Sequence, residues 1–238
     1  VRALKGRALR LAFDRFVADE WRGRTARARA LDEFARAEAA WLADYALFVA
    51  LHDDEQGGRP WTEWPAPLRD RDPAAPADAR ARLSGRILFH TWLQWQLEEQ
   101  WHAARRAANA AGVELGGDLP FMVATDSADV WARRGDFRLD ARVGVPPDAF
   151  SATGQDWAMP TYRWDRIRPT GFAWMRARVR RFAALYDGCR VDHLVGFFRT
   201  YVREQTGEAA FVPAEQSEQT LQGERVLEVL SATGARII

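Results

Sequence analysis

The second half of the chain alternates between short apolar segments and amphipathic ones. The run 119–124 is apolar and bounded by turn-forming residues, as buried strands usually are, and 188–192 is interpreted as another short strand. The stretch 172–186 between them has the spacing of an amphipathic helix. Strands that alternate with helices predict an α/β fold for this half. The segments that follow are a helix around 226–230, ended by Gly234, and a strand that begins at 235–238.

The first 111 residues are predicted to form a mainly helical segment. Aromatic residues from Phe34 to Phe48 recur at spacings of seven, four and three, which places them on one helix face. An irregular Gly- and Pro-rich connection is expected over 57–76, and a second long helix from about 79 to 111. Tryptophan is abundant, with 11 residues, and it serves in protein cores as well as in sugar-binding clefts.

Composition excludes several classes of function. The formal net charge is +1 and acidic residues are interleaved with the arginines, so no nucleic-acid partner is expected. No run of about 18 apolar residues occurs, so no membrane partner is expected. Cys189 is the only cysteine, which excludes a disulfide within the chain and favours a reducing, cytoplasmic location. No spacing of His, Cys and carboxylate residues matches a zinc site, so neither a metal nor another cofactor is expected.

Asp192 is the strongest candidate for a chemical role. It ends a predicted strand, and strand alternation places Arg190 on the same side. A guanidinium beside a carboxylate keeps it ionised and oriented, as the nucleophile of a retaining glycosidase requires. The alternative is a structural Arg–Asp pair, because such pairs are common without a function. Asp126 also lies just past an apolar run, and the ends of strands carry the active sites of α/β barrels.

Four segments of the chain form a recognisable series. They are GDLPFMVATDSADVW at 117–131, GVPPDAFSATGQDW at 144–157, YRWD at 162–165 and RVDH at 190–193. The helical half adds DYALF at 44–48 and RPWTEWP at 59–65. In this order they closely resemble the amylomaltases, the 4-α-glucanotransferases or disproportionating enzymes of glycoside hydrolase family 77. The resemblance runs from about Leu31 to the last residue.

The resemblance implies both a fold and an activity. The fold is part of a TIM-like (β/α)8 barrel with inserted, largely helical subdomains, divided here into a helical segment, 1–111, and partial barrel elements, 112–238. The activity is retaining transfer of α-1,4-glucan segments between maltooligosaccharides through a covalent glycosyl–Asp intermediate. Asp192 would be the nucleophile, Arg190 its orienting partner and Asp118 the residue that helps to hold the arginine. The implied substrate-binding residues, several of them in a flexible covering loop within 126–165, are Asp126, Ser127, Asp148, Phe150, Gln155, Trp157 and His193.

The sequence departs from the family at three places. Ala149 stands where the family usually has tyrosine, Ala158–Met159 where it has Gly-Asn, and Leu194–Val195 where many members have an aromatic-basic pair. These departures leave acceptor preference open.

The general acid of the family is a glutamate in a motif after the next strand. We therefore expect an internal fragment with an incomplete barrel, inactive alone, whose general acid lies beyond Ile238. Two alternatives remain open, a non-catalytic glucan-binding module derived from such an enzyme and a helical scaffold for protein partners. A glutamate shortly after the last strand would favour the enzyme.

Overall fold

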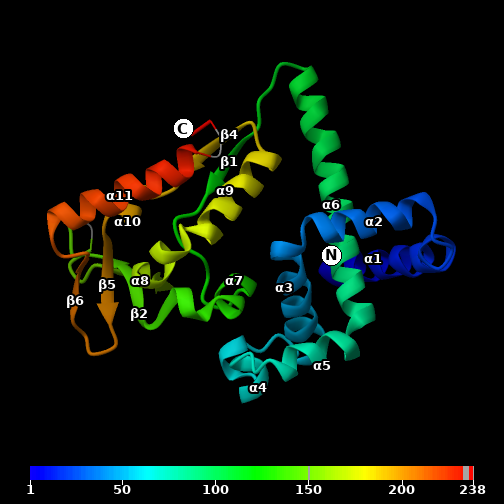
Figure 1. The fold of residues 1–238 in the computed structure, drawn as a ribbon, viewed down its shortest axis with the longest axis horizontal. Helices are drawn as coiled ribbons and strands as arrows, with labels where there is room; N and C mark the ends of the chain where they lie inside the picture. The colour runs from blue at the N-terminus through cyan, green and yellow to red at the C-terminus, as the bar shows by residue number, and fades with distance from the viewer. Residues whose placement is uncertain (150, 233–235, 238) are drawn as a thin grey trace. The chain divides into compact units, whose positions relative to one another are not determined.

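The computed structural model describes residues 1–149, 151–232 and 236–237. The chain divides into two compact units, Val1–Gln100 and Trp101–Ile238, which are described separately. Figure 1 shows helices through the first unit, and both strands and helices in the second. The second unit confirms the α/β class that its sequence pattern predicts.

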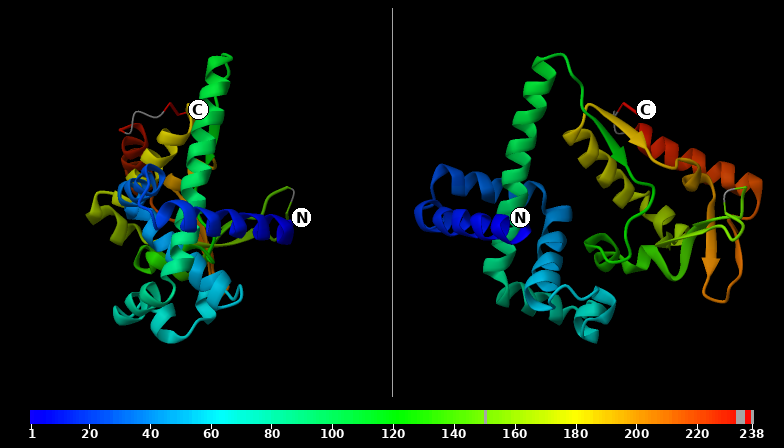
Figure 2. Two further views of the ribbon diagram at one scale, coloured as in Figure 1. Left: turned by 90° about the vertical axis from the view of Figure 1, so that its right-hand side faces the viewer. Right: turned by 180° about the vertical axis from the view of Figure 1, so that it is seen from behind.

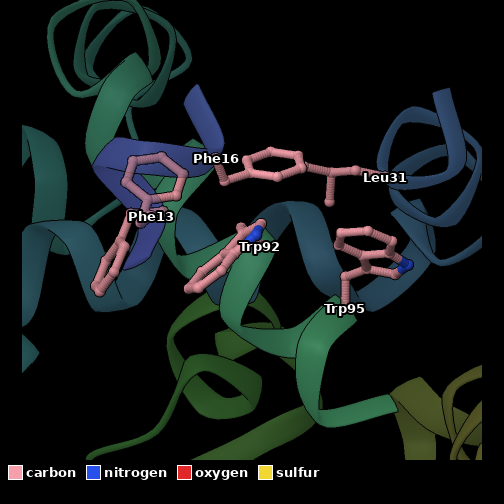
Figure 3. Packing of buried hydrophobic residues seen from close by; sticks show 6 residues of the cluster. Phe13, Phe16, Leu31, Trp92 and Trp95 are labelled. Carbon is pink, nitrogen blue, oxygen red and sulfur yellow. The ribbon is translucent and has the colours of Figure 1, made fainter. Parts of the chain in front are cut away.

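The first unit is built from helices packed through aromatic side chains. Phe13 of α1 and Phe89 of α6 meet edge to face with ring centroids 5.2 Å apart, and Phe16 lies 6.0 Å from Trp95. Figure 3 shows Phe13 and Phe16 beside Trp92, in a cluster that also includes Leu31. These tryptophans therefore belong to the core. The elements are α1 (Arg2–Phe16), η1 (Val17–Trp21), α2 (Ala26–Ala37), α3 (Ala39–Val49), η2 (Ala50–Glu55), η3 (Trp61–Glu63), α4 (Ala66–Arg69), α5 (Ala74–Arg82) and α6 (Ser84–Ala110).

Three details of the predicted helical pattern are wrong. The aromatic face from 34 to 48 belongs to two helices, because the chain turns at Glu38 between α2 and α3. The helix expected from 79 to 111 is likewise two helices that meet at Leu83. The connection 57–76 is not irregular throughout, because burial of Trp61 and Trp64 organises short helices there. Gly112 does end α6, in a left-handed conformation with φ of 77°.

A parallel pair of strands organises the second unit. β1 (Gly116–Leu119) pairs with β4 (Gly188–Val191) in a register that sets Asp118 beside Arg190. Cys189 also forms a parallel bridge to Ile237, while 233–235 and 238, where Gly234 and the ends of the last predicted strand fall, lie outside the described residues. The strand predicted at 119–124 is shifted, because Pro120 has no N–H with which to continue the ladder.

α9 (Ala173–Leu185) packs against this parallel pair, as its amphipathic spacing predicts (Figure 2). Gly117 permits the close approach. A Cβ atom at this position would lie 2.4 Å from Cζ of Phe182 and 2.6 Å from Cδ2 of Tyr186. The glycine next to Asp118 therefore sets the distance between the strand and its covering helix.

A second sheet has four antiparallel strands, and the first two of them along the chain lie in the region predicted as a long loop. Its order is β3-β2-β5-β6. The strands form because apolar residues alternate: Ala141 and Val143 of β2 and Val202 of β5 are buried on one face. The loop prediction over 126–165 is therefore wrong for all but its tip. The strands are β2 (Phe137–Val145), β3 (Gln155–Tyr162), β5 (Thr200–Glu204) and β6 (Ala209–Val212).

Short helices complete the second unit. Phe197 of α10 packs edge to face on Phe121, which follows β1, with ring centroids 5.0 Å apart. The helix predicted around 226–230 is α11 (Gln216–Ser231). None of the helices in the described ranges has the length and apolarity needed to cross a membrane. The remaining elements are α7 (Ala128–Ala132), η4 (Arg134–Asp136), α8 (Trp164–Ile167), η5 (Arg168–Thr170) and α10 (Val195–Phe198).

Candidate active site

Arg190 bridges two carboxylates where the parallel strands end. Its Nη1 donates to Oδ2 of Asp118 at 2.7 Å, and its Nη2 donates to Oδ1 of Asp192 at 2.8 Å. The backbone produces this geometry, since Asp118 and Arg190 are register partners and Asp192 follows β4 directly. The N–H of Asp192 donates to the carbonyl oxygen of Leu119 at 3.0 Å and extends the pairing by one residue. Asp192 thus lies at the carboxyl end of its strand, as predicted.

Solvent reaches all three side chains of this bridge. Their exposed fractions are 58% for Asp118, 59% for Arg190 and 50% for Asp192. The charge of Asp118 and the hydrogen bond to it, followed by the charge of Asp192, raise the pKa of Arg190 above its ordinary value. Exposed ion pairs add little to stability, so this bridge contributes little to folding. Its two hydrogen bonds hold the guanidinium between the two carboxylates.

His193 follows Asp192 in a left-handed conformation, with φ of 53°. Its ring lies 5.6 Å from that of Phe121 and 5.0 Å from that of Trp157, centroid to centroid. The pKa of His193 is lowered because neighbouring side chains keep water from its ring, and the Asp192 carboxylate partly opposes this shift. Strained backbone of this kind is common at functional sites.

Trp157, a residue of the predicted covering loop, makes a ring contact with His193. The rings meet edge to face at 73°, and the indole Nε1 donates to Oε1 of Gln155 at 3.0 Å. Gln155 and Trp157 both lie on β3 and not in the connection between β2 and β3. Gln155 therefore forms a hydrogen bond directly with Trp157, and the ring contact between Trp157 and His193 connects the antiparallel sheet to the end of β4.

Asp148 shapes the tip between β2 and β3. Its Oδ1 accepts from the N–H of Ser151 at 2.8 Å, and the hydroxyl of Ser151 donates to the carbonyl oxygen of Gly154 at 2.8 Å. These bonds form a tight turn in which the Asp148 side chain remains exposed. Phe150, predicted to bind sugar, lies outside the described residues.

Asp126 and Ser127 follow β1 after a connection without regular secondary structure. Because β1 ends at Leu119, Asp126 does not directly follow a strand, and the argument that predicted it from strand position is wrong. Its side chain is exposed. Ser127 caps α7: its Oγ accepts from the N–H of Val130 at 3.3 Å.

Asp156 is a residue of this region that sequence reasoning missed. Its Oδ1 accepts from the N–H of Ala158 at 2.8 Å, and its Oδ2 accepts from Nη1 of Arg142 at 3.3 Å. Ala158 has φ of 55°, a left-handed conformation that favours glycine. The hydroxyl of Thr125 donates to the carbonyl oxygen of Ala158 at 3.1 Å. The signal in the sequence was Ala158, which replaces the glycine usual in the resembled family.

Tyr162 ties the end of β1 to the antiparallel sheet. Its hydroxyl donates to the carbonyl oxygen of Phe121 at 2.6 Å, and burial raises its pKa to about 12. The side chain therefore stays protonated and can keep donating this bond at physiological pH. Over the part of the chain that the structure describes, no group of three or more His, Cys, Asp or Glu side chains is placed to hold a metal ion.

Comparison with known proteins identifies the family. The sequence profile of the 4-alpha-glucanotransferases matches residues 1–236. The chain belongs to the 4-alpha-glucanotransferase family. It is 44% identical over 170 residues to the 4-alpha-glucanotransferase of Thermus thermophilus and 40% identical over 164 residues to the plastid enzyme of Oryza sativa. These matches cover 69% and 66% of this chain, but 34% and 27% of the relatives, so the chain spans about a third of their length.

Solved structures of the same family resemble the fold. The amylomaltase of Streptococcus agalactiae in complex with acarbose superposes with a TM-score of 0.80 at 28% identity, over 95% of this chain and 50% of that one. The amylomaltase of Corynebacterium glutamicum gives 0.72 at 26% identity, over 98% and 30%. The family expected from the four sequence segments is confirmed.

Proposed function

We propose that this chain carries the nucleophile side of the active site of a 4-alpha-glucanotransferase. The enzyme would transfer α-1,4-glucan segments between maltooligosaccharides with retention at the anomeric carbon. The observation that carries the proposal is the Asp118–Arg190–Asp192 bridge at the carboxyl ends of two parallel strands. Active sites of α/β barrels lie at such ends, and we propose that β1 and β4 belong to a barrel of this kind.

Asp192 would attack the anomeric carbon of the donor glucan. One carboxylate oxygen is held by Arg190, and attack by the carboxylate breaks the glycosidic C–O bond and forms a glycosyl ester. The leaving oxygen takes a proton from a second carboxyl group, which in retaining sites stands about 5–5.5 Å from the nucleophile. The hydroxyl of an acceptor glucan then displaces Asp192 and gives its proton to the second carboxyl group, which the first step left as a carboxylate, and a second inversion restores the α configuration.

Arg190 and Asp118 would keep the nucleophile ready for this attack. The charges of Asp118 and Asp192 raise the pKa of Arg190, so its guanidinium stays protonated and keeps its hydrogen bond to the Asp192 carboxylate. Asp118 occupies the other arm of the guanidinium and prevents it from turning away from the nucleophile. Both residues act on Asp192 without contacting the reacting bond.

The substrate would lie between the end of β4 and the β2–β3 tip. Trp157 offers a flat aromatic surface beside His193, and Phe150 is proposed to add a second one. Asp148, Gln155, Asp126 and Ser127 are proposed as hydrogen-bonding partners of sugar hydroxyls. A related amylomaltase has been solved with acarbose, which supports a glucan as the ligand.

Replacement of Asp192 separates the enzyme from the glucan-binding module. In the protein that carries this chain, Asp192→Asn should lower maltotriose disproportionation, measured as glucose release, by at least about a thousandfold, because the covalent route is lost. Binding of acarbose should change little. Asp140→Asn removes a carboxylate paired with Arg138 at 3.3 Å on β2 and serves as control. Asp192→Asn activity within tenfold of the parent would reject the nucleophile, and acarbose binding without parent activity would support the module.

A further inference from the structure

Two of the non-glycine residues with left-handed backbone lie in one small region. Among the described residues these conformations occur at Arg24, Arg71, Ala158, Phe172 and His193. Ala158 follows Trp157 directly, and His193 is the residue whose ring Trp157 contacts. The contact between β3 and the end of β4 is therefore held by strained backbone on both sides. Strain persists only where the surroundings enforce it.

Asp156 enforces the conformation at Ala158. Its carboxylate accepts the Ala158 N–H at 2.8 Å, two residues along the chain, which closes a turn around Trp157. Thr125 holds the carbonyl side of Ala158 at 3.1 Å, so the peptide groups on both sides of the strained residue are tied down. Trp157 between them donates to Gln155 and has its ring against His193.

The backbone of Ala158 and two nearby arginines lower the pKa of this carboxylate. Arg142 donates to Asp156 at 3.3 Å, and Arg203 adds a favourable charge while it donates to the carbonyl oxygen of Thr153 at 3.3 Å. The bond from the Ala158 N–H, and after it Arg142 and Arg203, lower the pKa of Asp156. The Arg142 side chain is 62% exposed and that of Asp156 40%, so the ion pair itself contributes little. The bond to the backbone of Ala158 is the contact with a structural effect.

We propose that Asp156 is a positioning residue of the active site, which fixes the left-handed turn at Ala158 and thereby holds Trp157 against His193 beside Asp192. The proposal rests on the proposed function, because it assigns a consequence for glucan binding to a contact that Trp157 makes. It also explains how this chain tolerates alanine at a backbone position that suits glycine. Asp156 acts through Trp157 and does not contact the substrate.

Glycine at position 158 should compensate for loss of the Asp156 carboxylate. Without Asp156, Ala158 relaxes out of the left-handed region and Trp157 leaves His193, so binding must restore the turn. A left-handed residue with a side chain costs about 1–2 kcal/mol, which corresponds to about 5- to 30-fold weaker binding. Asp156→Asn keeps an oxygen acceptor for the Ala158 N–H, whereas Asp156→Ala does not. Ala158→Gly removes the strain that Asp156 opposes.

The test compares these variants in the protein that carries this chain. The Kd for acarbose, measured by calorimetry, and the KM for maltotriose should both rise about 5- to 30-fold in Asp156→Ala, with kcat changed less than threefold. Asp156→Asn and the double variant Asp156→Ala/Ala158→Gly should return to within about threefold of the parent. Asp140→Ala, which removes a carboxylate paired with Arg138 at the same 3.3 Å on the neighbouring strand, should have no effect.

Hydrogen exchange without ligand gives a second readout that does not depend on activity. The peptide that contains Ala158 should exchange faster in Asp156→Ala, and in the double variant too, but not in Asp140→Ala. Equal losses in Asp156→Asn and Asp156→Ala, or failure of Ala158→Gly to restore binding, would overturn the proposal. If the parent neither binds acarbose nor turns over maltotriose, the proposed function fails. Exchange at Ala158 that is the same in Asp156→Ala as in the parent would then refute the role of Asp156 separately.

Discussion

Gly117→Ala tests the close packing of α9 on β1 beside Asp118. The added Cβ would lie 2.4 Å from Cζ of Phe182, whereas carbon atoms pack at about 3.5–4.0 Å, so atoms must move by more than about 1 Å. The ring cannot move freely. Its centroid is 4.6 Å from that of Tyr186, which in turn packs edge to face on Trp101 at 5.2 Å.

Overpacking of this kind costs about 1–3 kcal/mol in the free energy of unfolding. A loss of that size in a domain of this length lowers the melting temperature by several degrees, roughly 2–8 °C for each kcal/mol. Thermal unfolding followed by circular dichroism measures the shift. Gly135→Ala is the matched control, because no atom lies within 4 Å of the Cβ that it would add and its φ is not positive. Equal melting temperatures for Gly117→Ala and the parent would refute the packing argument.

Two further predictions concern binding and pH. Trp157→Ala should weaken acarbose or maltooligosaccharide binding by about 1–3 kcal/mol, and Phe150→Ala by a similar amount, measured by calorimetry. Trp157→Phe should retain most of the affinity. Unchanged affinity in both alanine variants would show that these aromatic residues are structural. The pKa of Asp187 is lowered from 3.8 to about 2, first by the N–H of Leu115 and then by Asn109 and Arg105, so its contribution to stability is present above pH 3.8 and lost as pH falls through 2. Asp187→Asn should therefore lower the melting temperature at neutral pH but not below about pH 2, and an equal deficit at both pH values would contradict this linkage.

The parallel strands could be predicted from the sequence because their signals are local. The run 188–192 begins with a glycine and alternates Cys189 and Val191 with the charged Arg190 and Asp192, and β4 lies at 188–191 as expected. The Arg190–Asp192 pair also follows from alternation along one strand, and the structure places it at 2.8 Å. The pairing of Asp118 with Arg190 across strands is not a local property, and the family resemblance supplied it.

The antiparallel sheet was not predicted because each of its strands, taken alone, gives only a weak sequence signal. β2 carries exposed charged residues, such as Asp140, on the face away from Val143, and Pro146 and Pro147 directly after it favoured a loop. Strands of such a sheet are stabilised by partners distant in sequence, here β5 against β2. Asp156 was missed for a related reason, since its role depends on the backbone conformation of Ala158, which composition does not reveal.

A trapped glycosyl ester tests the identity of the nucleophile most directly. The protein that carries this chain would be mixed with α-maltosyl fluoride, quenched in acid and digested with pepsin for mass spectrometry of the peptides. Fluoride leaves with little help from an acid, so the step depends chiefly on the nucleophile. We predict the added maltosyl mass on the peptide that contains Asp192, and none in Asp192→Asn. A sugar ester on a peptide that contains Asp118 or Asp126 instead, or one that persists in Asp192→Asn, would contradict the assignment.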